Sequence, residues 1–134
     1  MALSSSRKGM TFGFTKTLPK ILFSKSQTAQ AVVAKIEGLL RNHPNPTRFN
    51  IEGTTIAYYL SKDMDVTLDI YNAVGNRIYS DMYASGDNGG SGTLYNQITL
   101  TTSDLANNLS AGIYFYTISN NGVLLAKTKM AVIP

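Results

Sequence analysis

The sequence predicts an all-β protein, an antiparallel β-sandwich of about seven strands that follows a basic N-terminal arm and one short α-helix. Three observations predict it. Beyond Pro46, apolar and polar side chains alternate with a period of two residues, as in half-buried strands. Turn signals rich in Gly and Asn separate these runs at short spacing. Charged residues make up only 15% of the chain, whereas Tyr, Thr, Asn, Ser and Gly are plentiful, a composition that favours strands and an extracellular type of surface.

The basic charge is concentrated in the N-terminal segment. Residues 1–43 hold seven Lys and Arg residues and one acidic residue, a net charge of +6. Residues 44–134 hold five Lys and Arg residues and seven acidic residues, a net charge of −2. A basic arm can bind nucleic acid, anionic lipid or the acidic surface of a partner protein, and a solvated tail is the alternative. Its apolar side chains prefer a groove to water, so we expect them to dock the arm. These candidate docking residues are Phe12, Phe14, Ile21, Leu22 and Phe23.

A change of period predicts the helix. Apolar residues from Ala29 to Leu40 recur at the three- and four-residue spacing of one helical face, which predicts an amphipathic helix over about 26–41. Pro44 and Pro46 must end it, because proline removes a backbone donor and disfavours helical geometry in the residue before it. We therefore place the domain boundary there, with the arm in 1–43 and the sandwich in 44–134.

Six runs of strand-forming residues follow this boundary. They are residues 55–60, 66–71, 77–83, 94–100, 112–119 and 123–133, and residues 49–51 are a candidate for a seventh strand. Gly75 and Gly122 lie in turns between runs, where positive φ is needed. The Gly-rich stretch 86–92 lacks the Lys-Ser/Thr ending of a phosphate-binding loop, so we interpret it as a flexible crossover.

Few residues are suited to catalysis or metal binding. The chain has no cysteine, which excludes disulfides and thiolate metal sites. Its single histidine, His43, lies in the presumed linker, and the sequence has no glycine-flanked nucleophile to match it. Asp63, Asp65 and Asp69 are close in sequence, and Asp63 and Asp65 are similar to the start of a calcium loop. The turn glycine and terminal acid of such a loop are missing and Asp69 lies within a predicted strand, so a solvated turn is preferred. We expect no enzymatic activity, no cofactor and no metal.

Eight tyrosines lie on the predicted strands. Aromatic side chains on a sheet can bind single-stranded nucleic acid or sugar. Because the sandwich region is net acidic, we prefer the interpretation that the rings fill the margin of the sandwich with their hydroxyl groups outside. Nucleic acid and anionic lipid are therefore candidate partners of the basic arm alone.

Five pieces of sequence occur in an order that one family shares. They are Pro44-Asn45-Pro46, Thr55-Ile56-Ala57-Tyr58-Tyr59-Leu60, the Ile70-Tyr71 pair with the glycine turn after it, Leu109-Ser110-Ala111-Gly112-Ile113-Tyr114-Phe115-Tyr116, and Lys127-Thr128-Lys129-Met130. Together they resemble the type A C-terminal sorting domain of type IX secretion cargo and its relative, the Ig-like domain of the flagellar hook-cap protein.

The resemblance implies a seven-stranded Ig-like sandwich whose terminal strands are recognised by outer-membrane export machinery. In the family, a sortase then removes the domain or exchanges it for a lipopolysaccharide link. Carried over to this sequence, the pattern implies a recognition region at Gly112, Tyr114, Lys127 and Lys129. It also implies a location outside the cell, or on the surface of a bacterium with type IX secretion.

A second class of function stays open. Residues 1–43 contain no apolar stretch long enough for a secretory signal, and the chain contains none long enough for a transmembrane segment. The alternative is a small structural subunit of a larger assembly, such as a surface filament, a virion or a membrane-associated complex, docked through its N-terminal arm.

Overall fold

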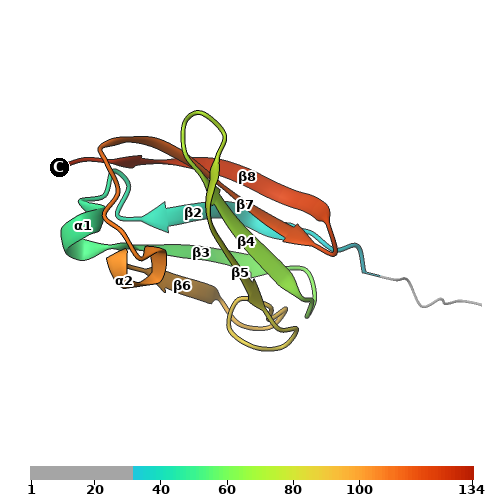
Figure 1. Ribbon diagram of the computed structural model, residues 1–134. Coiled ribbons are helices and arrows are strands. Elements are labelled where there is room, and N and C mark those ends of the chain that lie inside the picture. The colour runs from blue at the N-terminus through green and yellow to red at the C-terminus, as the bar shows by residue number, and fades with distance from the viewer. Residues whose placement is uncertain (1–31) are drawn as a thin grey trace, which may run out of the picture. The chain divides into compact units, whose positions relative to one another are not determined.

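Two antiparallel sheets pack face to face, with two short helices at one end of the sandwich (Figure 1). The computed structural model describes residues 32–134, so the candidate docking residues of the arm lie outside the described part. Contacts group Val33–Pro134 into one unit. Its elements are β2 (Ile36–His43), α1 (Phe49–Glu52), β3 (Thr54–Leu60), β4 (Val66–Tyr71), β5 (Arg77–Tyr83), β6 (Asn96–Leu100), α2 (Thr102–Leu105), β7 (Gly112–Asn120) and β8 (Val123–Val132).

The seven strands of the described part form one sheet in the order β2-β3-β6 and one in the order β5-β4-β7-β8. Side chains alternate along each strand, so one set from each sheet meets in the core. Ile56 of β3, Leu68 of β4 and Ile118 of β7 have no exposed surface. Each such burial stabilises the fold by roughly 1.5–3 kcal/mol. The predicted all-β antiparallel sandwich is confirmed.

The helix predicted over about 26–41 is wrong where the structure describes it, because Ile36–His43 form strand β2. Gly38 has φ +76°, outside the helical region. Leu39 is 74% exposed while Leu40 packs on the core, which is the alternation of a strand. Pairing of β2 with β3 satisfies backbone groups that would otherwise be left at an unpaired edge, and this tertiary gain overrides the helical spacing. The sandwich therefore begins before the boundary predicted at Pro44.

The seventh strand expected at residues 49–51 is also wrong, because Phe49–Glu52 form helix α1. The amides of Ile51 and Glu52 donate to the Arg48 carbonyl at 2.8 and 3.0 Å, so the backbone bonds locally. Phe49 is buried in the core while Ile51 is 82% exposed. A single helical turn suits this segment, since it connects the antiparallel neighbours β2 and β3. The strand that completes the seven-stranded sandwich is β2.

The Gly-rich stretch between β5 and β6 is packed against the domain and does not match the flexible crossover expected. Gly89 and Gly90 are buried. A Cβ added to Gly90 would lie 2.3 Å from the Ala84 carbonyl oxygen and 2.5 Å from that of Met64. The glycines are needed here for close approach of backbone to backbone.

Candidate functional site

The C-terminal hairpin β7–β8 is the feature on which the sequence prediction centred. Its turn contains Asn121 at φ 50° and Gly122 at φ 80°, the left-handed pair that a tight hairpin needs. The strands pair from Gly112 opposite Val132 to Asn120 opposite Val123, with one irregularity after Ile118. Because β8 lies at the end of the sheet order, one of its two long sides has no strand of its own sheet beside it.

The four residues predicted to form the recognition region lie on this hairpin but do not share one surface. Tyr114 is buried and points into the sandwich, and its hydroxyl donates to the Ser110 carbonyl at 2.8 Å. Lys127 and Lys129 are exposed on the outer face of the sheet, which is the face away from Tyr114. Their cross-strand partners on β7 are Thr117 and Phe115. Gly112 is exposed at the beginning of β7. Only the two lysines are thus placed to meet a partner together.

The segment around Pro44-Asn45-Pro46 covers part of the β8 edge. The Ala131 amide donates to Asn45 Oδ1 at 3.0 Å, and Asn45 Nδ2 donates to the Lys129 carbonyl at 3.3 Å. The Thr47 amide donates to the Ala131 carbonyl, and the Ile133 amide to the Thr47 carbonyl, both at 2.9 Å. The C-terminal end of β8 is therefore held by the segment between β2 and β3.

The earlier half of β8 keeps an open edge. In an antiparallel strand, every second residue points its backbone groups to the same side. The backbone groups of Lys129 and Ala131 point to the outer edge of β8, where Asn45 and Thr47 bond to them. Lys127 therefore points its N–H and C=O to this same edge. No other segment of residues 32–134 bonds to the Lys127 backbone groups. These backbone groups of Lys127 are therefore unpaired among the described residues, while β2 of the other sheet lies near β8.

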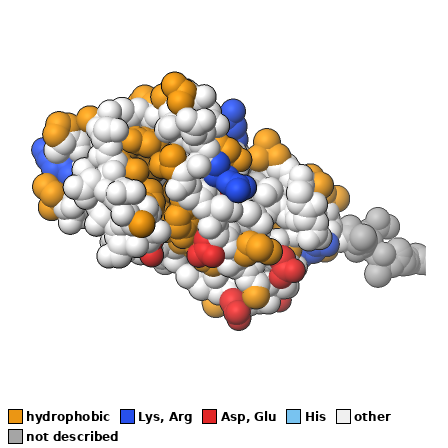
Figure 2. All heavy atoms as spheres, viewed as in Figure 1, with side chains coloured by type: hydrophobic (Ala, Val, Ile, Leu, Met, Phe, Trp, Pro, Cys, Tyr) orange, Lys and Arg blue, Asp and Glu red, His pale blue; other side chains and the backbone are white. Residues whose placement is uncertain are grey.

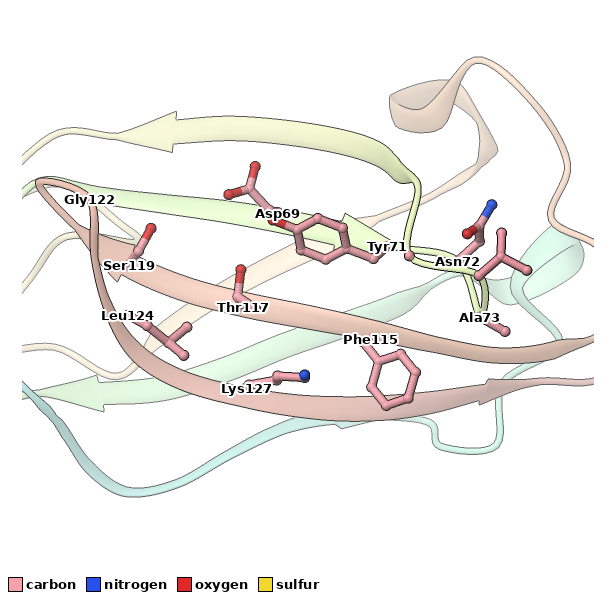
Figure 3. Close-up of a pocket in the computed structure, with 12 residues that line it drawn as sticks. Asp69, Tyr71, Asn72, Ala73, Phe115, Thr117, Ser119, Gly122, Leu124 and Lys127 are labelled. Atoms are coloured by element: carbon pink, nitrogen blue, oxygen red, sulfur yellow. The ribbon is translucent and has the colours of Figure 1, made fainter.

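A groove lies on the outer face of the same sheet, across β4, β7 and β8 (Figure 3). It has a volume of about 740 Å³. Cross-strand pairs build its floor, with Asp69 opposite Thr117 and Tyr71 opposite Phe115. Leu124 and Lys127 border it on the β8 side, and the Lys127 ammonium lies 5.4 Å from the centre of the Phe115 ring.

Asp69 is the unusual member of this groove. The residue is only 9% exposed, and its Oδ1 atom has no hydrogen-bond partner. The nearest cation is the Arg77 guanidinium, whose Nη1 lies 3.7 Å from Oδ1. Most buried polar atoms are hydrogen-bonded, so an unpaired carboxylate oxygen is an exception that needs a physical reason. Asp69 was considered from the sequence only beside Asp63 and Asp65 as a calcium ligand and was not predicted as a residue of this groove, although an aspartate within a strand is itself an uncommon choice.

The outer face of the other sheet carries a second, smaller hollow of about 540 Å³. Its lining includes Arg41, His43, Thr55 and Gln97, and Tyr95 packs against Tyr59 with 4.5 Å between ring centres and a tilt of 33° between the rings. His43 is exposed on β2 and is not a linker residue. Within residues 32–134, no group of three His, Cys, Asp or Glu side chains is arranged to hold a metal ion.

Asp63 and Asp65 act as anchors for the loop that follows β5. Asp63 Oδ1 accepts the Gly92 amide at 2.7 Å, and Asp65 Oδ1 accepts the Ser85 amide at 2.8 Å. A carboxylate that accepts a backbone N–H makes a strong, charge-assisted hydrogen bond. The pair therefore stabilises loop geometry, which the solvated-turn interpretation had not included.

The tyrosines divide between the core and the surface. Tyr58 and Tyr116 have no exposed surface, and burial raises the pKa of both phenols above its usual value. Their hydroxyls donate to the Gly89 carbonyl and to Asn42 Oδ1. On the face seen in Figure 2, Lys and Arg side chains are scattered and do not gather into one patch. This arrangement does not favour a nucleic-acid surface on that face of the sandwich.

These features define a class of protein, a small antiparallel β-sandwich with a partly open C-terminal hairpin. The structure is similar to that of dimeric latent PorU from Porphyromonas gingivalis, with a TM-score of 0.54 and 20% sequence identity over 81% of this chain. The likeness covers 10% of the PorU chain and shows a shared fold. No family model and no curated protein matches the sequence. No helix within residues 32–134 is both long and apolar enough to span a membrane.

Proposed function

We propose that the sandwich is a non-enzymatic, protein-binding module of the sorting-domain type, recognised by outer-membrane export machinery in a bacterium with type IX secretion. The observation that carries this proposal is the β7–β8 hairpin, whose edge strand is open around Lys127 while its far end is held by Asn45 and Thr47. An edge that is open over part of its length suits recognition by strand addition.

The sequence motifs support this proposal because they occupy positions with a physical role in the hairpin. Asn45 of the Pro-Asn-Pro motif hydrogen-bonds to β8, and the final basic motif places Lys127 and Lys129 beside the edge. The similarity to a small part of PorU gives further support, since a sandwich of this fold occurs there as a portion of a longer chain. Such a module would act outside the cell or at its surface.

The recognition would combine backbone pairing with charge. The N–H and C=O of Lys127 would pair with a strand of the partner, and the ammonium groups of Lys127 and Lys129 would attract an acidic partner surface. Rim charges of this kind act mainly on association rate and on specificity.

A secretion assay tests the proposal. The whole chain is fused behind a periplasmic reporter and expressed in a bacterium with type IX secretion, and the reporter is assayed on the cell surface and in the medium. We expect surface or secreted reporter with the wild-type chain and retention in the periplasm when Lys127→Glu and Lys129→Glu are combined. The matched control combines Lys35→Glu and Lys62→Glu, two exposed lysines away from the hairpin, and should be exported. Retention of the wild-type fusion contradicts the proposal.

The alternative function is that of an assembly subunit docked through its arm. It is favoured by the net charge of +6 in residues 1–43 and by the apolar side chains Phe12, Phe14, Ile21, Leu22 and Phe23. Deletion of residues 1–25 should then convert an oligomer into a monomer, as measured by light scattering. A full-length chain that is already monomeric contradicts this alternative.

A further inference from the structure

We propose that Asn121, in the turn of the β7–β8 hairpin, is a site of spontaneous deamidation in the folded chain. The modification needs only water as a co-reactant and leaves aspartate or isoaspartate in the turn. The sequence contains two Asn-Gly pairs, Asn88-Gly89 and Asn121-Gly122, and the structure gives them opposite environments. The inference concerns the hairpin turn alone and does not depend on a sorting role.

The reaction is an attack by the Gly122 backbone nitrogen on the side-chain carbonyl carbon of Asn121. A bond forms between this nitrogen and Cγ, the Cγ–Nδ2 bond breaks, and the proton of the Gly122 amide leaves with the side-chain nitrogen as ammonia. Water then opens the five-membered succinimide ring at either of its carbonyl groups, which gives aspartate or isoaspartate. Asparagine is a chemically labile residue, and a following glycine has no Cβ to crowd the attacking nitrogen.

Both reacting groups of the hairpin pair are free in the folded chain. Asn121 and Gly122 are exposed, and Gly122 lies in the bend that joins β7 to β8 (Figure 3). The neighbouring Asn120 donates from Nδ2 to the Asp65 carbonyl at 2.7 Å. In contrast, neither the Asn121 side chain nor the Gly122 amide makes a hydrogen bond to any other group of residues 32–134. Rotation of this peptide unit therefore breaks no hydrogen bond of its own.

The turn must open for the reaction, because the closed form holds Asn121 at φ 50° and Gly122 at φ 80°. The strand pair next to the turn is Asn120 with Val123, so few backbone bonds have to separate. Val123 and Leu124 are 63% and 58% exposed, and little apolar contact holds the tip closed. Segments of this kind open locally at low free energy while the rest of the domain stays folded. The reactive conformation is therefore accessible in the native state.

The other Asn-Gly pair is held in place by hydrogen bonds. Asn88 Nδ2 donates to the Gln97 carbonyl at 2.8 Å and its Oδ1 accepts the Gln97 amide at 3.0 Å, so both ends of the side-chain amide are bound. The attacking nitrogen is also engaged, because the Gly89 amide donates to Asn96 Oδ1 at 2.9 Å. Gly89 is buried, and its carbonyl accepts the Tyr58 hydroxyl. Reaction at Asn88 therefore requires the loop between β5 and β6 to leave the core.

The products change the hairpin in two ways. Either product adds one negative charge beside the outer-face groove, whose lining includes Gly122. Isoaspartate also places one extra carbon atom in the backbone of a two-residue turn. Because loop length fixes the register of a hairpin, we expect the pair of Asn120 with Val123 to be lost, while the pairs nearer the centre of the sheet are kept.

Mass spectrometry of the full chain, incubated at neutral pH, tests the inference. Chymotrypsin cleaves after tyrosine and separates the two pairs, because Tyr95 and Tyr116 lie between them. The rates at which aspartate and isoaspartate appear are compared. We expect Asn121 to react at least about tenfold faster than Asn88 in the folded chain. In urea the two rates should become similar, because each asparagine is followed by glycine and the hydrogen bonds of the loop are lost.

Two variants complete the test. Asn121→Ser should abolish the hairpin product and leave the rate at Asn88 unchanged. Asn121→Asp adds the charge without the extra backbone carbon. Hydrogen exchange of the Val123 amide, measured by NMR, should be faster in the isoaspartate form than in this variant, while the Ile118 amide serves as the internal reference.

Four results would overturn the inference. They are equal rates at Asn121 and Asn88 in the folded chain, a faster reaction at Asn88, no isoaspartate at Asn121, and a ratio of rates that is the same in urea as in native buffer. The last result would show that the structure does not select the site. The secretion assay above uses freshly prepared chain and is decided independently of all four.

Discussion

Asn96 holds the loop between β5 and β6 against the core. Its Oδ1 accepts the amides of Gly89 and Ser91 at 2.9 and 3.0 Å, and its Nδ2 donates to the carbonyls of Tyr58 and Ser91 at 3.2 and 2.9 Å. The side chain has no exposed surface. A buried amide whose donors and acceptor are all used restricts the loop to a single conformation, because any other arrangement leaves a polar group unpaired.

Asn96→Asp should therefore destabilise the domain by about 3 kcal/mol, because a buried carboxylate would replace the donor to two carbonyl oxygens. The free energy of unfolding in urea measures the effect. Asn107→Asp, the same change at an exposed residue, is the control and should lie within about 0.5 kcal/mol of the wild type. Equal stability of the two variants would contradict the role assigned to Asn96.

The buried phenols predict a loss of stability at alkaline pH. Desolvation raises the pKa of Tyr58 and Tyr116 in the folded state above the value of 10.0 that applies when the chain is unfolded. Between these two pKa values the unfolded state binds fewer protons than the folded state, so stability falls as pH rises. The stability associated with the protonated phenols is fully present below pH 10 and is lost as the pH rises above it.

Each of the two phenols should lower the free energy of unfolding by up to about 1.4 kcal/mol per pH unit above pH 10. Urea denaturation between pH 8 and pH 11.5 measures this slope. Tyr58→Phe should make the slope shallower by one proton, because the group that ionises on unfolding is gone. A slope that does not change in Tyr58→Phe would show that the phenol is not protected in the folded state.

At the level of the elements, β8 is held along only part of its length. The Asn45 side chain bonds to both Lys129 and Ala131, whereas the edge at Lys127 has no partner among the described residues. Exposed edges invite pairing with other chains, and proteins normally cover or interrupt them. The Pro-Asn-Pro segment covers the C-terminal half, so the open stretch is short.

Asn45→Ala should release the end of β8. The Ala131 amide loses its acceptor, so we expect its hydrogen exchange to become about tenfold faster, as measured by NMR at constant pH. The amide of Ile118, in the centre of the sheet, is the internal reference and should change much less. Asn107→Ala is the matched control. If the Ala131 amide exchanges at the same rate in both variants, Asn45 does not hold the strand.

For the molecule as a whole, β2 is a necessary part of the sandwich. It pairs with β3 at Ile36 and Glu37 and again from Arg41 to His43, and Asn42 on β2 accepts the Tyr116 hydroxyl from the opposite sheet at 3.1 Å. Asn42 Nδ2 also donates to Thr54 Oγ1 at 3.1 Å. Removal of β2 would leave these buried polar groups without partners and would expose the edge of β3.

We therefore expect residues 33–134 to fold and residues 44–134 to be unfolded or aggregated. Circular dichroism and the dispersion of an NMR spectrum distinguish the two outcomes. The longer fragment should give a strand-dominated spectrum with a cooperative thermal transition. A well-folded shorter fragment would restore the boundary at Pro44.

Much of the fold could be read from alternation and turn residues. The runs at 66–71 and 77–83 match β4 and β5, and the Asn-Gly turn is followed by β8 as predicted. The errors fall where a segment's local pattern fits two structures. Residues 36–40 have apolar spacing that suits a helix, and only the free edge of β3 selects the strand.

The candidate sites were less predictable than the strands. Tyr114 was grouped with Lys127 by sequence resemblance, but the pleat of β7 turns Tyr114 to the core. The groove brings Asp69 and Thr117 together from positions 48 residues apart, a proximity that depends on strand order. Strand order is a long-range property, which no local pattern contains.

By itself, the sequence determined the all-β class, the terminal hairpin and its turn, and the absence of disulfides, because period, turn residues and cysteine count are local or compositional properties. Only the tertiary structure decided that Ile36–His43 join the sandwich, that Asn45 covers the end of β8, and that Asp69 is largely buried beside Arg77. The physical reason is that hydrogen bonding and burial at these positions depend on partners that are distant in the chain.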